Sequence, residues 1–208
     1  MKAGRIFLIR HGQTAWNKVR YQGWGDPPLD QCGREQSETI WNALKEEPID
    51  KVFSSSLIRA VETIRPLVTR KQLPILLSDD LRELNYGLLE GKMKKDHPLK
   101  VKKNNLHLPV PGGESLSDLY GRAVRFIEGI TSDLFSKKNI IIVGHYWSNR
   151  MVLGAILGSS FDAVITESDY RPKNGSILEI SYEIDPEDRI NFPASHLRDT
   201  LLNKRSPL

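Results

Sequence analysis

The fold is decided by the stretch Arg5-Ile6-Phe7-Leu8-Ile9-Arg10-His11-Gly12. Its four consecutive apolar residues, 6–9, form a short run rich in isoleucine and phenylalanine, which is typical of a buried strand in a parallel sheet. Such strands end at the rim of the sheet, where ligands bind. The stretch therefore predicts that a fixed cation, Arg10, and a titratable nucleophile, His11, lie at this rim. Gly12 would leave the backbone room to turn there and an anion room to approach.

The composition is that of an ordinary globular protein. The chain has 208 residues, of which 39% are hydrophobic and 27% charged, so it can form a domain with a substantial core and is not mostly disordered. The net charge of +4 suits an anionic substrate. The sequence has no dense stripe of arginines, so its positive charge does not indicate a nucleic acid as the partner.

Cysteine usage and apolar runs indicate the compartment. Cys32 is the only cysteine, so no intramolecular disulfide can form, which fits a reducing compartment. We see no signal peptide before the first strand, and no apolar run approaches the roughly 20 residues needed to cross a bilayer. We therefore expect a cytoplasmic protein that does not bind to or cross a membrane.

Strand and helix patterns alternate along the chain. Strands are predicted at 6–9, 49–53, 73–77, 139–143 and 176–182, and helices at 31–46, 57–63, 116–135 and 147–157. The alternation predicts one α/β domain over 1–208, with helices on both faces of a sheet and the last strand at its edge. In this prediction residues 185–208 are a polar tail with a short helix at 194–202.

Further charged side chains follow predicted strands. Arg59 falls in the first turn of a helix, where the helix dipole disfavours a cation unless an anion sits above it. His145 follows a buried strand, in the same setting as His11. A lone histidine there is more often a core residue, and Glu83 could simply pair with its neighbour Arg82. Two histidines and two arginines in equivalent places favour a shared site.

Phosphoryl transfer without a metal uses groups of the kinds found at Arg10, His11, Arg59, Glu83 and His145. Arginines make forked hydrogen bonds to phosphate oxygens. A neutral imidazole can attack phosphorus, and a protonated one adds positive charge where the transferring group spreads its charge. A neutral carboxyl can protonate the leaving alkoxide and then accept a proton from water. Because the arginines and a histidine supply the charge that Mg²⁺ gives elsewhere, we expect neither a metal nor a cofactor.

Several motifs resemble those of the histidine phosphatase superfamily, also called phosphoglycerate-mutase-like. They are Leu8-Ile9-Arg10-His11-Gly12-Gln13-Thr14, Ser54-Ser55-Ser56-Leu57-Ile58-Arg59-Ala60-Val61-Glu62-Thr63, Leu81-Arg82-Glu83 with Gly87 and Glu90-Gly91, and Gly144-His145. The turn Pro111-Gly112-Gly113-Glu114-Ser115 is common in the smaller phosphatases of this family. The resemblance implies a phosphoglycerate-mutase-like fold, a three-layer α/β/α arrangement with a mostly parallel sheet and an antiparallel edge strand.

The resemblance also implies an activity and the residues that carry it. The implied activity is that of a metal-independent phosphomonoesterase that hydrolyses a small phosphorylated metabolite. The implied roles are His11 as phosphohistidine nucleophile, Glu83 as proton donor, Arg10, Arg59 and His145 as phosphoryl-binding groups, and Asn17 and Gln22 as lining of the same pocket. We expect Tyr146, which departs from the family pattern, to contact the substrate there as well.

Two features leave alternatives open. Many family members have a glycine after the second histidine, where this chain has Tyr146 and Trp147, which would narrow the pocket or stack on a substrate. Cofactor-dependent mutases usually carry a longer insertion than the segment 92–109, which favours a phosphatase, because a mutase must keep water from the phosphohistidine. The alternatives are a phosphoglycerate-type mutase and a phosphate-binding module with weakened catalysis.

The lysine-rich segment 92–103 has two interpretations. Its six lysines and one aspartate are typical of a solvated surface. Alternatively, the segment forms a basic lid that draws in acidic substrates, and together with Tyr146 and Trp147 it would govern selectivity. An exposed edge strand would also permit a homodimer.

Overall fold

The computed structural model describes residues 4–98, 106–166, 168–185, 187, 189–192 and 197–199. The strands of this part form one sheet in the order β3-β2-β4-β1-β5-β6, with β7 paired to β5. They are β1 (Gly4–Arg10), β2 (Lys51–Ser55), β3 (Ile75–Ser78), β4 (Asn139–Gly144), β5 (Ile177–Ile184), β6 (Ile190–Asn191) and β7 (Leu197–Asp199). Strands β1 to β4 are parallel and β5 is antiparallel to β1, which confirms the mostly parallel sheet.

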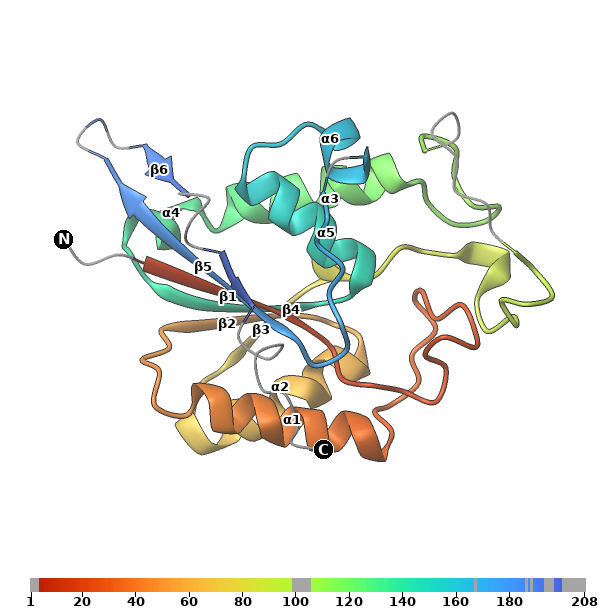
Figure 1. Ribbon diagram of the computed structural model, residues 1–208, viewed down its shortest axis with the longest axis horizontal. Helices are drawn as coiled ribbons and strands as arrows, with labels where there is room; N and C mark the ends of the chain where they lie inside the picture. The colour runs from red at the N-terminus through yellow and green to blue at the C-terminus, as the bar shows by residue number, and fades with distance from the viewer. Residues whose placement is uncertain are drawn as a thin grey trace.

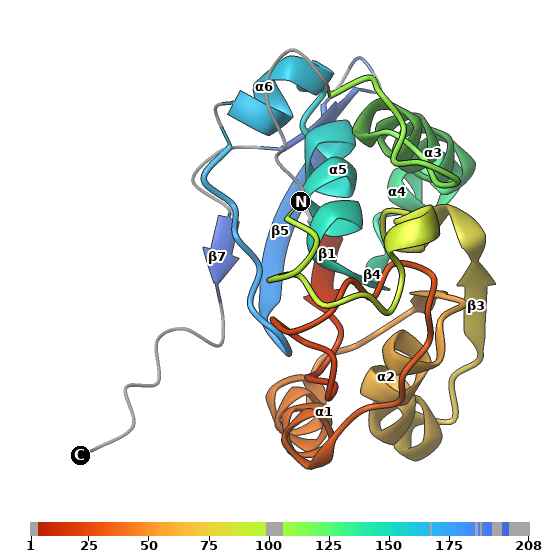
Figure 2. The ribbon, with the colours of Figure 1, turned by 90° about the vertical axis from the view of Figure 1, so that its right-hand side faces the viewer.

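Helices cover both faces of this sheet (Figure 1, Figure 2). One face carries α1 (Gln31–Leu44) and α2 (Ile58–Lys71), and the other carries α3 (Leu116–Gly129), α4 (Thr131–Phe135), α5 (Tyr146–Ile156) and α6 (Phe161–Thr166). Two short 3-10 helices, η1 (Asp79–Leu81) and η2 (Gly87–Leu89), follow β3. The three-layer α/β/α architecture is therefore confirmed. No helix within the described ranges is long and apolar enough to span a bilayer.

Strand β1 is buried on both faces, which explains its continuous apolar run. Ile6 and Leu8 belong to a core cluster with side chains of α3 and α5. Phe7 and Ile9 belong to a second cluster with side chains of α1 and α2. Because side chains alternate across a strand, every residue of the run meets a helical layer.

The register of β1 against β4 brings the two histidines together. Arg10 pairs with Gly144 where the two parallel strands end. The next residues, His11 and His145, therefore leave the sheet side by side, and the His11 amide donates to the Gly144 carbonyl at 3.0 Å. The position of His11 at the rim of the sheet is confirmed.

Gly12 allows the chain after β1 to lie directly on α1. A Cβ atom at Gly12 would lie 2.7 Å from the carbonyl oxygen of Gly33, and one at Gly33 would lie 2.1 Å from that of Gln13. Asp30 caps this end of α1, since its side chain accepts from the Gly33 amide at 2.8 Å. The backbone of α1 thus fills the space at Gly12 that we expected an anion to use.

The predicted helix 116–135 is interrupted. It ends as α3 at Gly129, and α4 begins at Thr131 after Ile130, whose φ of −103° and ψ of 6° lie outside the helical region. Glycine is a poor helix former and β-branched residues are weaker ones than alanine or leucine, so the stretch 129–131 favours a break.

The C-terminal region also differs from its prediction. The strand predicted at 176–182 corresponds to β5 but is not the last one, because β6 and β7 pair along its outer side. They satisfy main-chain groups that an edge strand would leave unpaired. Residues 197–199 of the predicted helix 194–202 form β7, and the rest of that helix lies outside the described residues. A homodimer stays a prediction.

Candidate active site

The predicted site residues meet at one cavity of about 310 Å³, beside the carboxyl ends of β1 and β4. Seven of the eight line it, namely Arg10, His11, Asn17, Gln22, Arg59, Glu83 and Tyr146. The eighth, His145, packs against His11, with 5.0 Å between the two ring centroids. The sheet and its loops thus bring together side chains that are far apart in the sequence.

His11 is oriented by a backbone hydrogen bond. Its Nδ1 lies 2.7 Å from the Gly12 carbonyl oxygen, which can only accept, so Nδ1 carries the proton and Nε2 keeps its lone pair. Burial, followed by the positive charges of Arg59 and Arg10, lowers the pKa of His11 well below its usual value. His11 is therefore a neutral imidazole at neutral pH, with Nε2 available as a nucleophile.

His145 lies behind the cavity rather than in its lining. It is fully buried, and its Nε2 lies 2.8 Å from the Ser55 hydroxyl, whereas Nδ1 has no hydrogen-bond partner in the described ranges. Burial, followed by the charges of Arg59 and His11, lowers the pKa of His145 well below its usual value. The structure thus opposes the protonated form that we predicted, because a buried ring near guanidinium groups favours its neutral form.

Arg59 anchors the loop that follows β1. It is fully buried in the first turn of α2, and it donates to the carbonyl oxygens of Gly23 at 2.7 Å and Gly25 at 2.8 Å. Its nearest carboxylate contact, to Asp26, is longer, at 3.4 Å. Burial lowers the pKa of Arg59 to about 10, so it remains a cation at neutral pH.

Arg10 reaches the same cavity from the end of β1. Its Nη1 donates to the Pro172 carbonyl at 2.8 Å, and its buried Nε has no partner in the described part of the chain. Its guanidinium carbon lies 5.4 Å from the centre of the Tyr146 ring, within cation–π range. Burial lowers the pKa of Arg10, and the charge of Glu83 opposes this shift. Arg10 is thus fixed by neutral groups, which leave its charge for an anion.

The carboxylate of Glu83 lies on the N-terminus of α5. One oxygen accepts from the Tyr146 amide at 3.0 Å, and the other accepts from the amides of Leu84 at 2.9 Å and Trp147 at 3.0 Å. Free amides and the helix dipole make the first turn of a helix a favourable place for an anion. To act as a proton donor, Glu83 must therefore turn one oxygen from these amides toward the leaving group.

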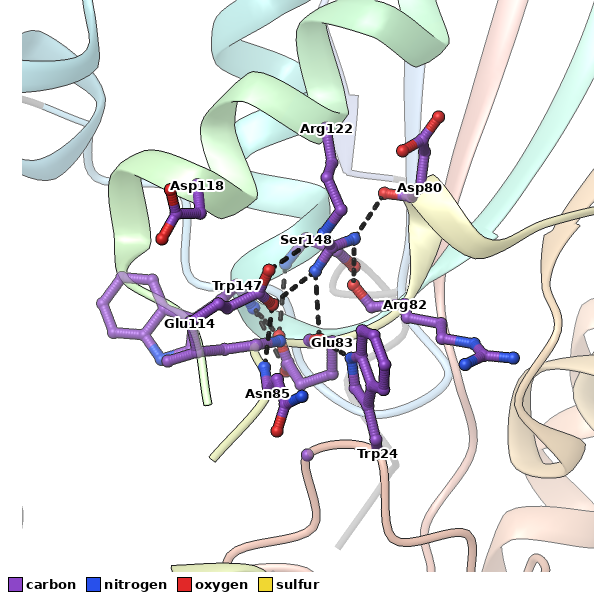
Figure 3. Close-up of polar contacts among 12 residues, drawn as sticks. Trp24, Asp80, Arg82, Glu83, Asn85, Glu114, Asp118, Arg122, Trp147 and Ser148 are labelled. Carbon is purple, nitrogen blue, oxygen red and sulfur yellow. Dashed lines mark hydrogen bonds and ion pairs between the residues drawn. The ribbon is translucent and has the colours of Figure 1, made fainter. Parts of the chain in front are cut away.

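The backbone carbonyl of Glu83 is held by two side chains, Trp24 and Arg122, that do not line the cavity (Figure 3). Its carbonyl oxygen accepts from the Trp24 indole at 2.9 Å and from Arg122 at 3.3 Å. Arg82 turns away and pairs with Asp79 at 2.9 Å. The alternative that Glu83 is merely the surface partner of Arg82 is therefore wrong.

The loop after β1 is held by its own polar side chains. The Asn17 side-chain oxygen accepts from the Thr14 amide at 2.7 Å, and that of Gln22 accepts from the Thr14 hydroxyl at 3.0 Å. Thr14 is buried and does not line the cavity, so its role is to order the loop.

Comparison with known proteins decides the family. Residues 6–187 match the family model of the histidine phosphatase superfamily (branch 1). The chain belongs to this superfamily. A probable phosphatase of Schizosaccharomyces pombe is 37% identical over 183 residues, which are 85% of this chain and 86% of that protein. A 2,3-bisphosphoglycerate-dependent phosphoglycerate mutase of Gloeobacter violaceus is 30% identical over 190 residues, which are 85% of this chain and 81% of that protein.

A solved phosphatase structure matches the fold as well. The crystal structure of an alpha-ribazole phosphatase from Shigella flexneri superposes with a TM-score of 0.76 at 26% identity, covering 90% of this chain and 94% of that one. The family and its phosphatase members make this protein an enzyme of the histidine phosphatase type. Its relatives include both mutases and phosphatases, so the comparisons do not determine its substrate.

Several cavity residues of this histidine phosphatase were missed or only partly anticipated. Five that we did not assign to the pocket line it, namely Lys18, Arg20, Gly23, Tyr86 and Asn174. Asn174 donates to the His11 carbonyl at 3.0 Å. The sequence signals Asn174-Gly175 as a turn, but nothing local names the partner of its side chain. Trp147, where we expected selectivity, also lines the cavity.

A cationic rim borders the cavity. Lys94 lines it, and its amide donates to the Val19 carbonyl at 2.9 Å, which joins the lysine-rich segment to the loop that carries Lys18 and Arg20. Lys18 has a φ of +65°, in the left-handed region that a residue with a side chain seldom adopts. Desolvation, followed by the charge of Arg10, lowers the pKa of Lys94. Lys94 therefore supports the interpretation of the lysine-rich segment as a basic lid. Positions 99–103 of this segment lie outside the described ranges.

Proposed function

We propose that this protein is a metal-independent phosphomonoesterase that hydrolyses a small phosphorylated metabolite through a phosphohistidine on His11. The observation that supports this best is an oriented, neutral imidazole beside two guanidinium groups at one cavity. Arg10 and Arg59 are bound mainly by backbone carbonyl groups, so their positive charge is available to the phosphoryl oxygens. In this role they supply the charge that Mg²⁺ gives in other phosphoryl-transfer enzymes.

In the first half-reaction, Nε2 of His11 attacks phosphorus, and the bond between phosphorus and the ester oxygen breaks. The leaving oxygen takes a proton from the carboxyl of Glu83, which releases the alcohol. The two guanidinium groups stabilise the negative charge spread over the transferring group.

In the second half-reaction, water attacks the phosphohistidine, and the bond between phosphorus and Nε2 breaks. Glu83, now a carboxylate, accepts the proton from this water and returns to its acid form. The products are inorganic phosphate and the neutral His11, whose Nδ1 keeps its proton and its hydrogen bond to the Gly12 carbonyl throughout.

Hydrolysis of p-nitrophenyl phosphate with a chelator present tests the proposal. We expect the native protein to release phosphate under these conditions and the His11→Ala variant to release none. His107→Ala is the matched control, because that histidine is exposed and does not line the cavity. Activity that disappears with chelator, or that survives in His11→Ala, would contradict the mechanism. Phosphate binding without any turnover would favour the weakened-module alternative.

A mutase is the second candidate, and the cationic rim favours it. Lys18, Arg20 and Lys94 suit a second anionic group on a substrate, as in a phosphoglycerate. Incubation with 3-phosphoglycerate and a trace of its 2,3-bisphosphate separates the two candidates. Phosphate release that exceeds isomerisation supports the phosphatase, and isomerisation with little release supports the mutase.

A further inference from the structure

Arg150 is a buried guanidinium that the mechanism has not used. It lies in α5, is 2% exposed, and donates to the carbonyl oxygens of Tyr170 at 2.7 Å and Val164 at 2.9 Å. Within the described ranges it forms no ion pair with a carboxylate. Because burying a charge is costly, a guanidinium here needs an explanation beyond packing.

The guanidinium group of Arg150 lies over the aromatic pair that follows His145. The guanidinium carbon of Arg150 lies 5.3 Å from the centre of the Trp147 ring and 5.9 Å from that of Tyr146. The Tyr146 ring also lies 5.4 Å from the guanidinium carbon of Arg10. Tyr146 is therefore in cation–π range of both guanidinium groups and links the buried one to the one that lines the cavity.

A second route from Arg150 to the same arginine runs through the backbone. The carbonyl of Tyr170 is held by Arg150, and two residues later the carbonyl of Pro172 accepts from Arg10 at 2.8 Å. Both neighbours that fix Arg10, the Tyr146 ring and the chain at 170–172, are thus in contact with Arg150. A change in Arg150 would reach Arg10 from two sides.

We propose that Arg150 is a positioning residue for Arg10, which it holds in the orientation that binds the phosphoryl group. Arg150 suits this task because a planar guanidinium donates to carbonyl groups at its edge while rings pack on its faces. A lysine keeps the charge but offers neither the plane nor the fork. The role rests on the proposed function, because it assigns Arg10 to the phosphoryl group, yet Arg150 itself does not line the cavity.

The Arg150→Lys variant tests this role, with the affinity for inorganic phosphate measured by calorimetry. We expect phosphate affinity and kcat/KM to fall at least about tenfold, since misplacing a binding group from a distance is costly. Arg70→Lys is the matched control: Arg70 also lies over an indole, at 5.1 Å from the centre of Trp41, but on α2 and away from the cavity. This control should keep the native phosphate affinity.

A double-mutant cycle with Arg10→Ala separates positioning from a general loss of structure. If Arg150 acts through Arg10, adding Arg150→Lys to Arg10→Ala should change phosphate affinity by less than about twofold. Additive losses would overturn the proposal, as would native phosphate affinity in Arg150→Lys.

Tyr146→Leu keeps the test decisive if Arg150→Lys does not fold. It removes the ring between the two guanidinium groups and leaves the carbonyl contacts of Arg150 in place. We expect weaker phosphate binding, and native affinity in this variant would also overturn the proposal. Because phosphate binding is measured without turnover, these results stand apart from the failure of catalysis in the native protein, which would instead refute the proposed function.

Discussion

Two cavities in the described part of the chain are each lined by three arginines, but only one is built as a phosphoryl site. The groove between α1 and α2 is the larger, with about 420 Å³ against about 310 Å³ for the catalytic cavity. In the groove, Arg70 is exposed and forms a bidentate ion pair with Glu38 at 2.7 and 3.1 Å. In the catalytic cavity, Arg59 is fully buried and donates to backbone carbonyl groups at 2.7 and 2.8 Å.

The difference shows that a desolvated charge, held mainly by backbone carbonyl groups, identifies the phosphoryl site better than the volume of a cavity does. An exposed ion pair is screened by water and salt and offers little to a ligand. A buried guanidinium acts in a low dielectric, where its attraction for an anion is stronger. The described lining of the catalytic cavity holds five cationic side chains and one carboxylate, Glu83, whose oxygens already accept from α5 amides.

Replacing one arginine in each cavity should give the largest contrast. We expect Arg59→Met to lower kcat/KM for p-nitrophenyl phosphate by about 10²–10³, the usual cost of removing one donor to a transition-state charge. Arg65→Met, an exposed position of the same helix that lines the groove, should stay close to the native value. An equal fall in kcat/KM in the two variants would contradict the distinction drawn between the two cavities.

The desolvation of the catalytic cavity should also make stability depend on pH. Burial lowers the pKa values of His11 and His145 in the folded chain, so below about pH 6.5 the unfolded chain binds more protons. The free energy of unfolding should therefore fall with decreasing pH in this window, by up to about 1.4 kcal/mol per pH unit for each histidine, and these groups should not change it above the window.

Urea unfolding at about pH 7 and about pH 5.5, one on each side of the unfolded-state pKa, measures the difference in the free energy of unfolding, and hence its average slope with pH. His145→Gln should reduce the slope, whereas His97→Gln, at an exposed position, should not. The same slope in the native protein and in His145→Gln would show that the buried rings do not titrate as we expect.

The smallest effect should come from the cationic rim. O-Phosphoserine and phosphoethanolamine differ by one carboxylate, so the ratio of their kcat/KM values reports attraction for a second anion. We expect Lys94→Met to lower this ratio by about two- to fivefold, in line with the modest energy of an exposed charge pair. Lys95→Met, an exposed neighbour that does not line the cavity, is the control, and an unchanged ratio in Lys94→Met would remove Lys94 from substrate selection.

The sequence predicted those parts of the site that follow from burial within one strand. The run 6–9 is continuously apolar because both of its faces are covered, and the same is true of β4, whose residues 139–144 are all buried. Parallel strands with polar residues just after them place those residues together at one edge of the sheet. Arg10, His11 and His145 were found in this way.

The remaining features depend on contacts that no local pattern encodes. Glu83 accepts from amides more than sixty residues further along the chain, at the N-terminus of α5. The register of β1 with β4 places His145 against His11, on the side away from the cavity. The sequence pattern alone cannot tell which of the two histidines lines the cavity and which is buried behind it. Gly12 packs against Gly33 of α1, so the reason for a glycine at position 12 can be found only from the packing of this helix on the sheet.

The central claim is that Nε2 of His11 carries the phosphoryl group, and trapping that intermediate tests it most directly. The native protein is mixed with p-nitrophenyl phosphate, quenched in alkali, digested and analysed by mass spectrometry and phosphorus NMR. We expect one phosphoryl group on the peptide that contains His11, bound at Nε2, because Nδ1 is held by the Gly12 carbonyl. A phosphoryl group on His145, on Nδ1 of His11, or on no histidine during active turnover would contradict this account.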